Sequence, residues 1–163
     1  DHLNAPFNNA NGENPYSIHS ELQQTTNDLV GLIRVKNELE ESITKISEFR
    51  KRAANVKVEG GKSFNPGFHL ALDLDNMLLV SEAIARCALQ REESRGGHTR
   101  NDFPKMDPNW RQVNSITTWD GSKMTVVKEP LPQMPKELAE LFDMEELKKY
   151  MTDAELANYG GAK

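Results

Sequence analysis

Residues 93–104 read ESRGGHTRNDFP and concentrate the side chains that could carry chemistry. Ser94, His98 and Asp102 have the residue types of a nucleophile, a base and an orienting acid, the three members of a catalytic triad. Their four-residue spacing would align them only on a helix that continues through the two intervening glycines, which glycine disfavours. No backbone donors for an oxyanion can be assigned either. The segment therefore does not favour nucleophilic catalysis, and a surface that contacts another molecule would explain the same residues.

Patterns that bind cofactors or metals are missing from the sequence. It contains no GxGxxG, GxxxxGK[ST] or HExxH, so phosphate-binding loops and helical zinc sites have no support. The four histidines, His2, His19, His69 and His98, show no metal-ligand spacing. Cys87 is the only cysteine, which excludes an internal disulfide and a zinc or iron–sulfur site made of cysteines of this chain alone. We expect no catalytic, cofactor-binding or metal-binding residue in this chain.

The composition is that of a globular domain. The chain has 163 residues, of which 37% are hydrophobic and 28% are charged, and its net charge is −5. No apolar run approaches the ~18 residues that a membrane span needs. A nucleic-acid binder usually carries a basic face, whereas residues 50–52, the Arg-Lys-Arg triplet, would point in different directions on a helix. We therefore predict no nucleic-acid partner.

Three segments have the apolar periodicity of amphipathic helices. The first runs from Pro15 to about residue 33, the second covers about 35–56, and the third covers about 68–93. The stripe expected on the third helix consists of Leu70, Leu74, Met77, Ser81, Ile84 and Ala88. Because short breaks join the three segments, they predict an antiparallel three-helix bundle that resembles a spectrin repeat.

The remaining chain predicts a β-hairpin and then a helical tail. The β-branched runs WRQVNSITTW and KMTVVKEP flank the turn sequence Asp120-Gly121-Ser122. In the tail, Thr152 and Glu155 have the spacing of a capping box. The fold class expected is mainly α, divided into an N-terminal loop (1–14), the three-helix bundle (15–95), a glycine loop with the hairpin (96–132) and the helical tail (133–163).

The segment QREESRGGHTRNDFPKMDPNW resembles a motif of succinate dehydrogenase and fumarate reductase flavoproteins, E-S-R-G-(A or G)-H-x-R-x-D-(F or Y)-P. NNANGENP is similar to the turn that opens the same C-terminal region, and ALDLDNMLLVSEAIARCALQREESRGGH is similar to its long helix. The resemblance spans about residues 8–110 and, more weakly, the hairpin to Pro132. It gives residues 133–163 no role.

The resemblance implies that this chain is the helical C-terminal domain of such a flavoprotein. The parts that bind FAD and the dicarboxylate precede this region in the family, so the parent subunit is expected to bind FAD and the chain alone is expected to be inactive. The implied partners are the upstream FAD and capping domains, an iron–sulfur subunit, and membrane-anchor subunits by indirect contact. The implied location is cytoplasmic, at the inner face of a bacterial plasma membrane.

Within this resemblance, a cluster of six residues is the candidate interdomain contact: Ser94, Arg95, Gly96, Gly97, His98 and Arg100. The glycines would permit positive φ and turn the chain sharply, leaving Arg and His donors outward for carboxylates or carbonyls of a neighbouring domain. The alternative is that Arg95 and Arg100 pair locally with Glu92, Glu93 or Asp102.

Two other functions stay open at this level. L-Aspartate oxidase has a similar Ser-Arg-Gly-x-His stretch, although Arg100 makes this segment look more like the dehydrogenase version. A free-standing helical interaction module is the alternative from another class.

Overall fold

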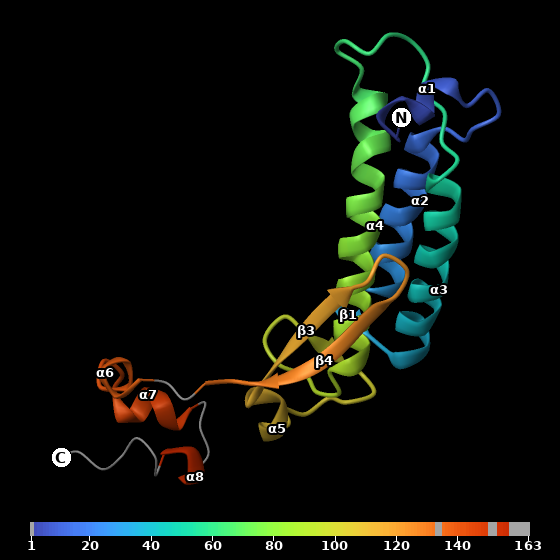
Figure 1. Cartoon of the computed structure of the whole chain (residues 1–163). Helices are drawn as coiled ribbons and strands as arrows, with labels where there is room; N and C mark the ends of the chain where they lie inside the picture. Colours follow the sequence, from blue (N-terminus) through green and yellow to red (C-terminus); the bar gives the residue numbers. More distant parts are fainter. Residues whose placement is uncertain (1, 133–134, 150–152, 157–163) are drawn as a thin grey trace.

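Three long helices form the body of the computed structural model, which describes residues 2–132, 135–149 and 153–156 (Figure 1). They are α2 (Pro15–Leu29), α3 (Lys36–Ala53) and α4 (Pro66–Gln90). Two of them begin alike: the Asn14 and Asn65 side chains accept hydrogen bonds from backbone N–H groups of the first turn, and a proline follows each asparagine. The predicted three-helix architecture, followed by a hairpin and short helix, is confirmed.

Most of the bundle core comes from one apolar row of each helix, and Val30, Val56 and Val58 beyond the helix ends add to it. It holds Ile18 and Leu22 of α2, Leu39, Ile46 and Phe49 of α3, and Ala71, Leu74, Leu78, Ala85 and Ala88 of α4.

Two details of the predicted stripes are wrong. Ile84 is 50% exposed, because the apolar residues of α4 cover so wide an arc that periodicity does not single out the buried row. The first helix ends at Leu29, and Ile33 lies in a short strand with 62% of its surface exposed. Gly31, which disfavours helix, lies just beyond this end.

The N-terminal residues, expected to be a loop, contain a 3-10 turn η1 (His2–Asn4) and the short helix α1 (Ala5–Asn8). They are attached to the bundle at the end of α3. Glu13 exchanges backbone hydrogen bonds with Asn55 and Lys57, of 2.9 and 2.8 Å. The neighbouring Gly12 is required here, because a Cβ would lie 2.6 Å from the backbone of Lys57. Periodicity cannot reveal such attachments because they depend on residues far away in the sequence.

The hairpin consists of β3 (Val113–Trp119) and β4 (Met124–Pro130), preceded by the helical turn α5 (Pro108–Arg111). The strands are antiparallel, with Val113 opposite Pro130 and Trp119 opposite Met124. Gly121 has a φ of +100° in the turn, as the sequence Asp-Gly-Ser predicts. The hairpin lies against α4, where Gln90 Nε2 donates to the Val126 carbonyl over 3.1 Å.

A buried charge cluster also contacts the hairpin. Glu82 of α4 is buried and lies 2.7 Å from Arg50 of α3 and 2.7 Å from Arg86 of α4. The Arg50 guanidinium stacks on the Trp119 ring at 4.6 Å from its centroid. One carboxylate thus connects two helices of the bundle and, through Arg50, the hairpin.

Three short helices follow the hairpin and lie beyond it, away from the bundle (Figure 1): α6 (Lys136–Ala139), α7 (Met144–Lys148) and α8 (Asp153–Leu156). Leu147 and Leu156 are their buried side chains. The expected capping box falls on Thr152, which lies outside the described residues. Over the described ranges, no helix combines the length and apolarity needed to cross a membrane.

Candidate functional site

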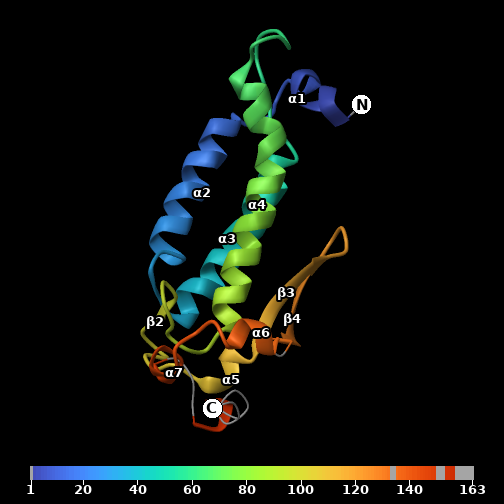
Figure 2. The same ribbon diagram turned by 90° about the vertical axis from the view of Figure 1, so that its left-hand side faces the viewer.

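The motif segment begins where α4 ends and folds back over the end of the bundle. Strand β1 (Ile33–Arg34), between α2 and α3, pairs in parallel with β2 (Thr99–Arg100). Ile33 lies opposite Thr99 and Arg34 opposite Arg100, and the Asn101 N–H donates to the Arg34 carbonyl over 3.0 Å. Figure 1 labels β1 and Figure 2 labels β2, each at the end of the bundle away from the N-terminus. The pairing joins the α2–α3 connection to the chain that follows α4.

Arg100 is the central side chain of this junction and is 0% exposed. Its Nε and Nη2 donate to Oδ1 and Oδ2 of Asp102, each over 2.7 Å. Its Nη1 donates to the carbonyls of Ala88 and Leu89 over 2.8 and 3.1 Å, which are at the C-terminal end of α4. A guanidinium is favourable there because the last carbonyls of a helix lack backbone donors and carry partial negative charge.

Asp102 completes the junction from the other side. Its Oδ2 accepts the Lys36 N–H over 3.0 Å, at the N-terminal end of α3. The hydrogen bonds from Arg100 lower the pKa of Asp102 to about 2. The ion pair therefore places a cation at one helix C-terminus and an anion at a neighbouring helix N-terminus, the arrangement that both helix dipoles favour.

Glu93 forms a second buried centre, with no exposed side-chain surface. It accepts hydrogen bonds from Arg91 Nε over 2.9 Å, from Arg95 Nε and Nη2 over 3.0 Å each, and from the Asp107 N–H over 2.9 Å. Burial raises the pKa of Glu93, but the donors from Arg95, the Asp107 backbone and Arg91 outweigh burial and hold the pKa at about 2. Glu93 is therefore ionised at neutral pH and fixes both arginines.

His98 is half-buried between two arginines. Its Nδ1 lies 2.7 Å from Arg34 Nη1, and its Nε2 lies 3.0 Å from the Arg91 carbonyl. A guanidinium can only donate and a carbonyl can only accept, so Nδ1 accepts and Nε2 carries the proton. Burial lowers the pKa of His98, and the neighbouring arginines lower it further. The imidazole ring is therefore neutral, and both of its nitrogens are hydrogen-bonded, one to Arg34 and one to the Arg91 carbonyl.

The two glycines form a tight turn. The Arg95 N–H donates to the His98 carbonyl over 2.8 Å, and the His98 N–H donates to the Arg95 carbonyl over 3.0 Å. Gly96 has a φ of +58°, but Gly97 does not have the positive φ expected for it. A Cβ at either position would meet no atom of the described chain within 4 Å. The turn is exposed, and nothing in its own packing requires a glycine at 97.

The hydroxyl of Ser94 is used inside the loop. Oγ donates to the Phe103 carbonyl over 2.9 Å and accepts the Arg100 N–H over 2.8 Å. No hydrogen bond joins Ser94 to His98 in the described chain, so these residues do not form a triad.

The structure thus brings all six predicted site residues together, and the side-chain donors among them bind acceptors of this chain: those of Ser94, Arg95, His98 and Arg100. The expectation that arginine donors point outward is wrong for Arg100, which is buried, and Arg95 pairs with Glu93, as the alternative of local pairing supposed. Sequence reasoning missed Arg34, whose contact with His98 spans 64 positions. No local spacing reports such a contact, and only the pairing of β1 with β2 creates it.

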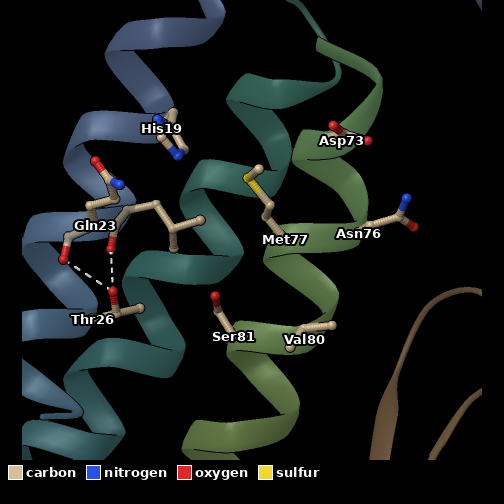
Figure 3. A pocket seen from close by; sticks show the side chains of 9 residues that line it. His19, Gln23, Thr26, Asp73, Asn76, Met77, Val80 and Ser81 are labelled. Atoms are coloured by element: carbon tan, nitrogen blue, oxygen red, sulfur yellow. Dashed lines mark hydrogen bonds between the residues drawn. The ribbon is translucent and has the colours of Figure 1, made fainter. Parts of the chain in front are cut away.

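The groove between α2 and α4 is the other candidate site (Figure 3). Its walls carry His19, Leu22, Gln23 and Thr26 of α2, and Asp73, Asn76, Met77, Val80 and Ser81 of α4. The Thr26 hydroxyl is bonded to carbonyls of its own helix, over 2.9 and 3.0 Å. Among the described residues, no three His, Cys, Asp or Glu side chains are grouped to hold a metal ion. The described residues of the groove therefore give no indication of a metal site.

Comparison with known proteins supplies the context of this loop. Residues 19–156 match the model of a family described as "Fumarate reductase flavoprotein C-term". A chain of the Mycobacterium smegmatis Sdh1 complex in the apo form is 49% identical, with a TM-score of 0.85 over 95% of this chain and 27% of that chain. A fumarate reductase (CoM/CoB) from Methanothermobacter marburgensis has a subunit that is 36% identical over 60% of this chain and 18% of its own length. L-Aspartate oxidase from Acinetobacter baylyi is 33% identical over 53% of this chain and 15% of its own length.

These matches correct one expectation and settle the family. The resemblance does not end near Pro132, because the matched range continues to residue 156 and includes α6, α7 and α8. The chain spans about a quarter or less of the lengths of these relatives. The match covers most of the chain. It includes nearly all of the bundle, the loop of residues 91–107 that contains the buried Arg100, and the hairpin. The chain therefore belongs to the family of fumarate reductase flavoprotein C-terminal domains.

Proposed function

We propose that this chain is the non-catalytic C-terminal helical domain of the flavoprotein of a succinate dehydrogenase or fumarate reductase, and that it buttresses the FAD domain. The parent enzyme would interconvert succinate and fumarate as an oxidoreductase acting on CH–CH donors. The observation that carries the proposal is the likeness to the Mycobacterium smegmatis Sdh1 complex, at 49% identity over 95% of this chain.

The site chemistry supports a structural role for the loop. Glu93 binds Arg91 and Arg95, Asp102 binds Arg100, and both nitrogens of His98 are occupied. A general base needs a free acceptor within reach of its substrate proton, and these groups already bind partners of their own chain. The loop is therefore suited to hold a fixed shape against a neighbour.

The residues of this chain do not fit an FAD site. The sequence has no glycine-rich phosphate loop, and the α2–α4 groove has no cationic side chain among its lining residues. FAD, which accepts a hydride in dicarboxylate oxidation, would be held by the upstream domain of the parent subunit. The chain would serve FAD only by supporting that domain.

The proposed partners follow from the same likeness. They are the upstream FAD and capping domains of the same polypeptide, an iron–sulfur subunit that receives the electrons, and, indirectly, membrane-anchor subunits that pass electrons to quinone. The Sdh1 complex has also been solved with UQ1, which supports a quinone as the acceptor. The proposed location is the inner face of a bacterial plasma membrane.

The decisive assay uses the full-length subunit loaded with FAD. It is given succinate with an artificial electron acceptor, then fumarate with an electron donor, and then L-aspartate. Turnover of succinate or fumarate supports the proposal. Turnover of aspartate without response to the other two would replace it with L-aspartate oxidase, the second candidate, which the likeness to the Acinetobacter baylyi enzyme supports.

A further inference from the structure

Four guanidiniums around the loop that follows α4 (residues 91–107, the motif loop) have only two carboxylate partners. The guanidiniums are those of Arg34, Arg91, Arg95 and Arg100. Only two carboxylates bind them, because Glu93 binds Arg91 and Arg95 while Asp102 binds Arg100. Among these described groups, the cation left without an acid is Arg34.

Arg34 is fixed in place without a counter-ion. Its Nε donates to the carbonyls of Val30 and Gly31 over 2.7 and 2.8 Å, and its Nη1 donates to His98. Among the described residues, no carboxylate forms an ion pair with it. Burial and the nearby Arg100 disfavour the charged form and lower the pKa of Arg34. A half-buried guanidinium in such surroundings is stabilised when an anion approaches from outside.

The surface beside Arg34 is apolar. Leu32 is 76% exposed and Ile33 is 62% exposed. Ile33 lies opposite Thr99, the first residue of the strand that follows the glycine turn. Neither the Gly96 nor the Gly97 N–H donates a hydrogen bond within the described chain, and a Cβ at either position would meet open space. Two exposed aliphatic residues, a cation without a carboxylate partner and the exposed glycine turn thus lie next to the β1–β2 pair in the chain, and together we call them the edge.

We infer that this edge, formed by Leu32, Ile33, Arg34, Gly96 and Gly97, docks a carboxylate-bearing segment of the upstream FAD domain of the same subunit, with Arg34 binding the carboxylate. The inference rests on the proposed function. It replaces Arg95 and Arg100, whose charges are already paired, with Arg34 as the docking cation.

The small size of the edge favours a partner in the same polypeptide. Separate proteins that associate stably bury about 1,600 Å² in total, far more than two aliphatic side chains and a turn can supply. A tethered partner has a high effective concentration, so a small patch is sufficient. The Sdh1 chain to which this chain is similar is far longer than the matched part, which is 27% of it.

Hydrogen exchange of the full-length, FAD-loaded subunit without other subunits tests the inference. The amides of Leu32, Gly96 and Gly97 donate no hydrogen bond in the described chain, so they exchange at nearly intrinsic rates if the edge is bare. Covered by the FAD domain, they should exchange at least about 100-fold more slowly. Intrinsic rates in the isolated subunit overturn the inference, and so does protection that appears only when the iron–sulfur subunit is added.

Two pairs of variants, each with a matched control, test whether Arg34 and Ile33 contact the FAD domain. Arg34→Gln should reduce the protection by about tenfold or more, whereas Lys51→Gln removes a charge from an exposed residue at the other end of α3 and should not. Ile33→Asp places an anion on the edge and should reduce the protection similarly, whereas Phe64→Asp changes a fully exposed side chain of the α3–α4 loop and should not. If Arg34→Gln does not fold, the second pair decides. Unchanged protection in Ile33→Asp and in any folded Arg34→Gln overturns the inference.

The same samples separate this inference from the proposed function. If the wild-type subunit oxidises succinate while the amides of the edge exchange at intrinsic rates, only the docking is contradicted. Wild-type subunit that turns over only aspartate contradicts the proposed function, and the exchange data then still report whether the edge is covered.

Discussion

Arg100 and Asp102 form a two-armed ion pair, with Nε–Oδ1 and Nη2–Oδ2 distances of 2.7 Å each, that joins the end of α4 to the start of α3. The pair therefore acts as a shared cap for two helices, and its loss should lower the free energy of unfolding of the whole bundle.

Replacement of Asp102 by Asn should destabilise the chain by about 3 kcal/mol, because it leaves a buried guanidinium without its counter-ion. Urea denaturation of the 163-residue chain measures the effect. Asp75→Asn, on the exposed surface of α4, removes the same charge and should change the free energy of unfolding by less than about 0.5 kcal/mol. Equal effects of the two substitutions would contradict the capping role.

Acid should weaken the fold through Glu93. Its pKa is about 2 in the folded chain, against an ordinary value of 4.5, so its stabilisation is complete above about pH 4.5 and is lost as the pH falls toward 2. Glu93→Gln should be less stable than wild type by about 3 kcal/mol at pH 7, and the difference should vanish near pH 2. Denaturation curves at several pH values test this. A difference that stays constant with pH, or one that Glu48→Gln reproduces, would refute it.

The two glycines of the turn should differ in their sensitivity to a larger side chain. Gly96→Val should destabilise the isolated chain by about 1–2 kcal/mol, because a β-branched residue resists a φ of +58°. Gly97→Val should leave the isolated chain nearly unchanged, because Gly97 has neither a positive φ nor a close neighbour in the described chain. In the full-length subunit both should reduce FAD retention. An equal loss of Tm in the isolated chain and the whole subunit for Gly97→Val would argue against an interdomain role.

The isolated chain should be colourless and should not reduce a dye with succinate. It has no phosphate-binding loop, and the guanidiniums of Arg95 and Arg100 donate to carboxylates of the same chain. The visible absorbance of the purified chain and a dye-reduction assay measure this. A yellow preparation that turns over succinate would show that a flavin site had been overlooked.

The sequence predicts the parts of the fold that local patterns determine. Pro15 marks the start of α2 and Asp120-Gly121 marks the hairpin turn, whereas α4 begins at Pro66, two residues before the predicted start. The wide apolar arc of α4 conceals which row is buried, so its periodicity places Ile84 in the core although this side chain is exposed.

The sequence predicts which residues form the candidate site but not how they are arranged. An arginine in a glycine-rich segment is ordinarily exposed, and only the carbonyls at the end of α4 make the burial of Arg100 favourable. Arg34 cannot be predicted at all, because the pairing of β1 with β2 depends on the packing of three helices around it.

The bundle is fastened at both ends of α3. At one end, Glu13 pairs with the chain around Val56, and at the other, β1 pairs with β2. Packed helices can ordinarily slide past one another when domains shift, but a sliding step here would break backbone hydrogen bonds at one end or the other. The three helices should therefore move as one rigid body. A displacement of the edge beside Arg34 should then shift the opposite end of the bundle by a similar amount.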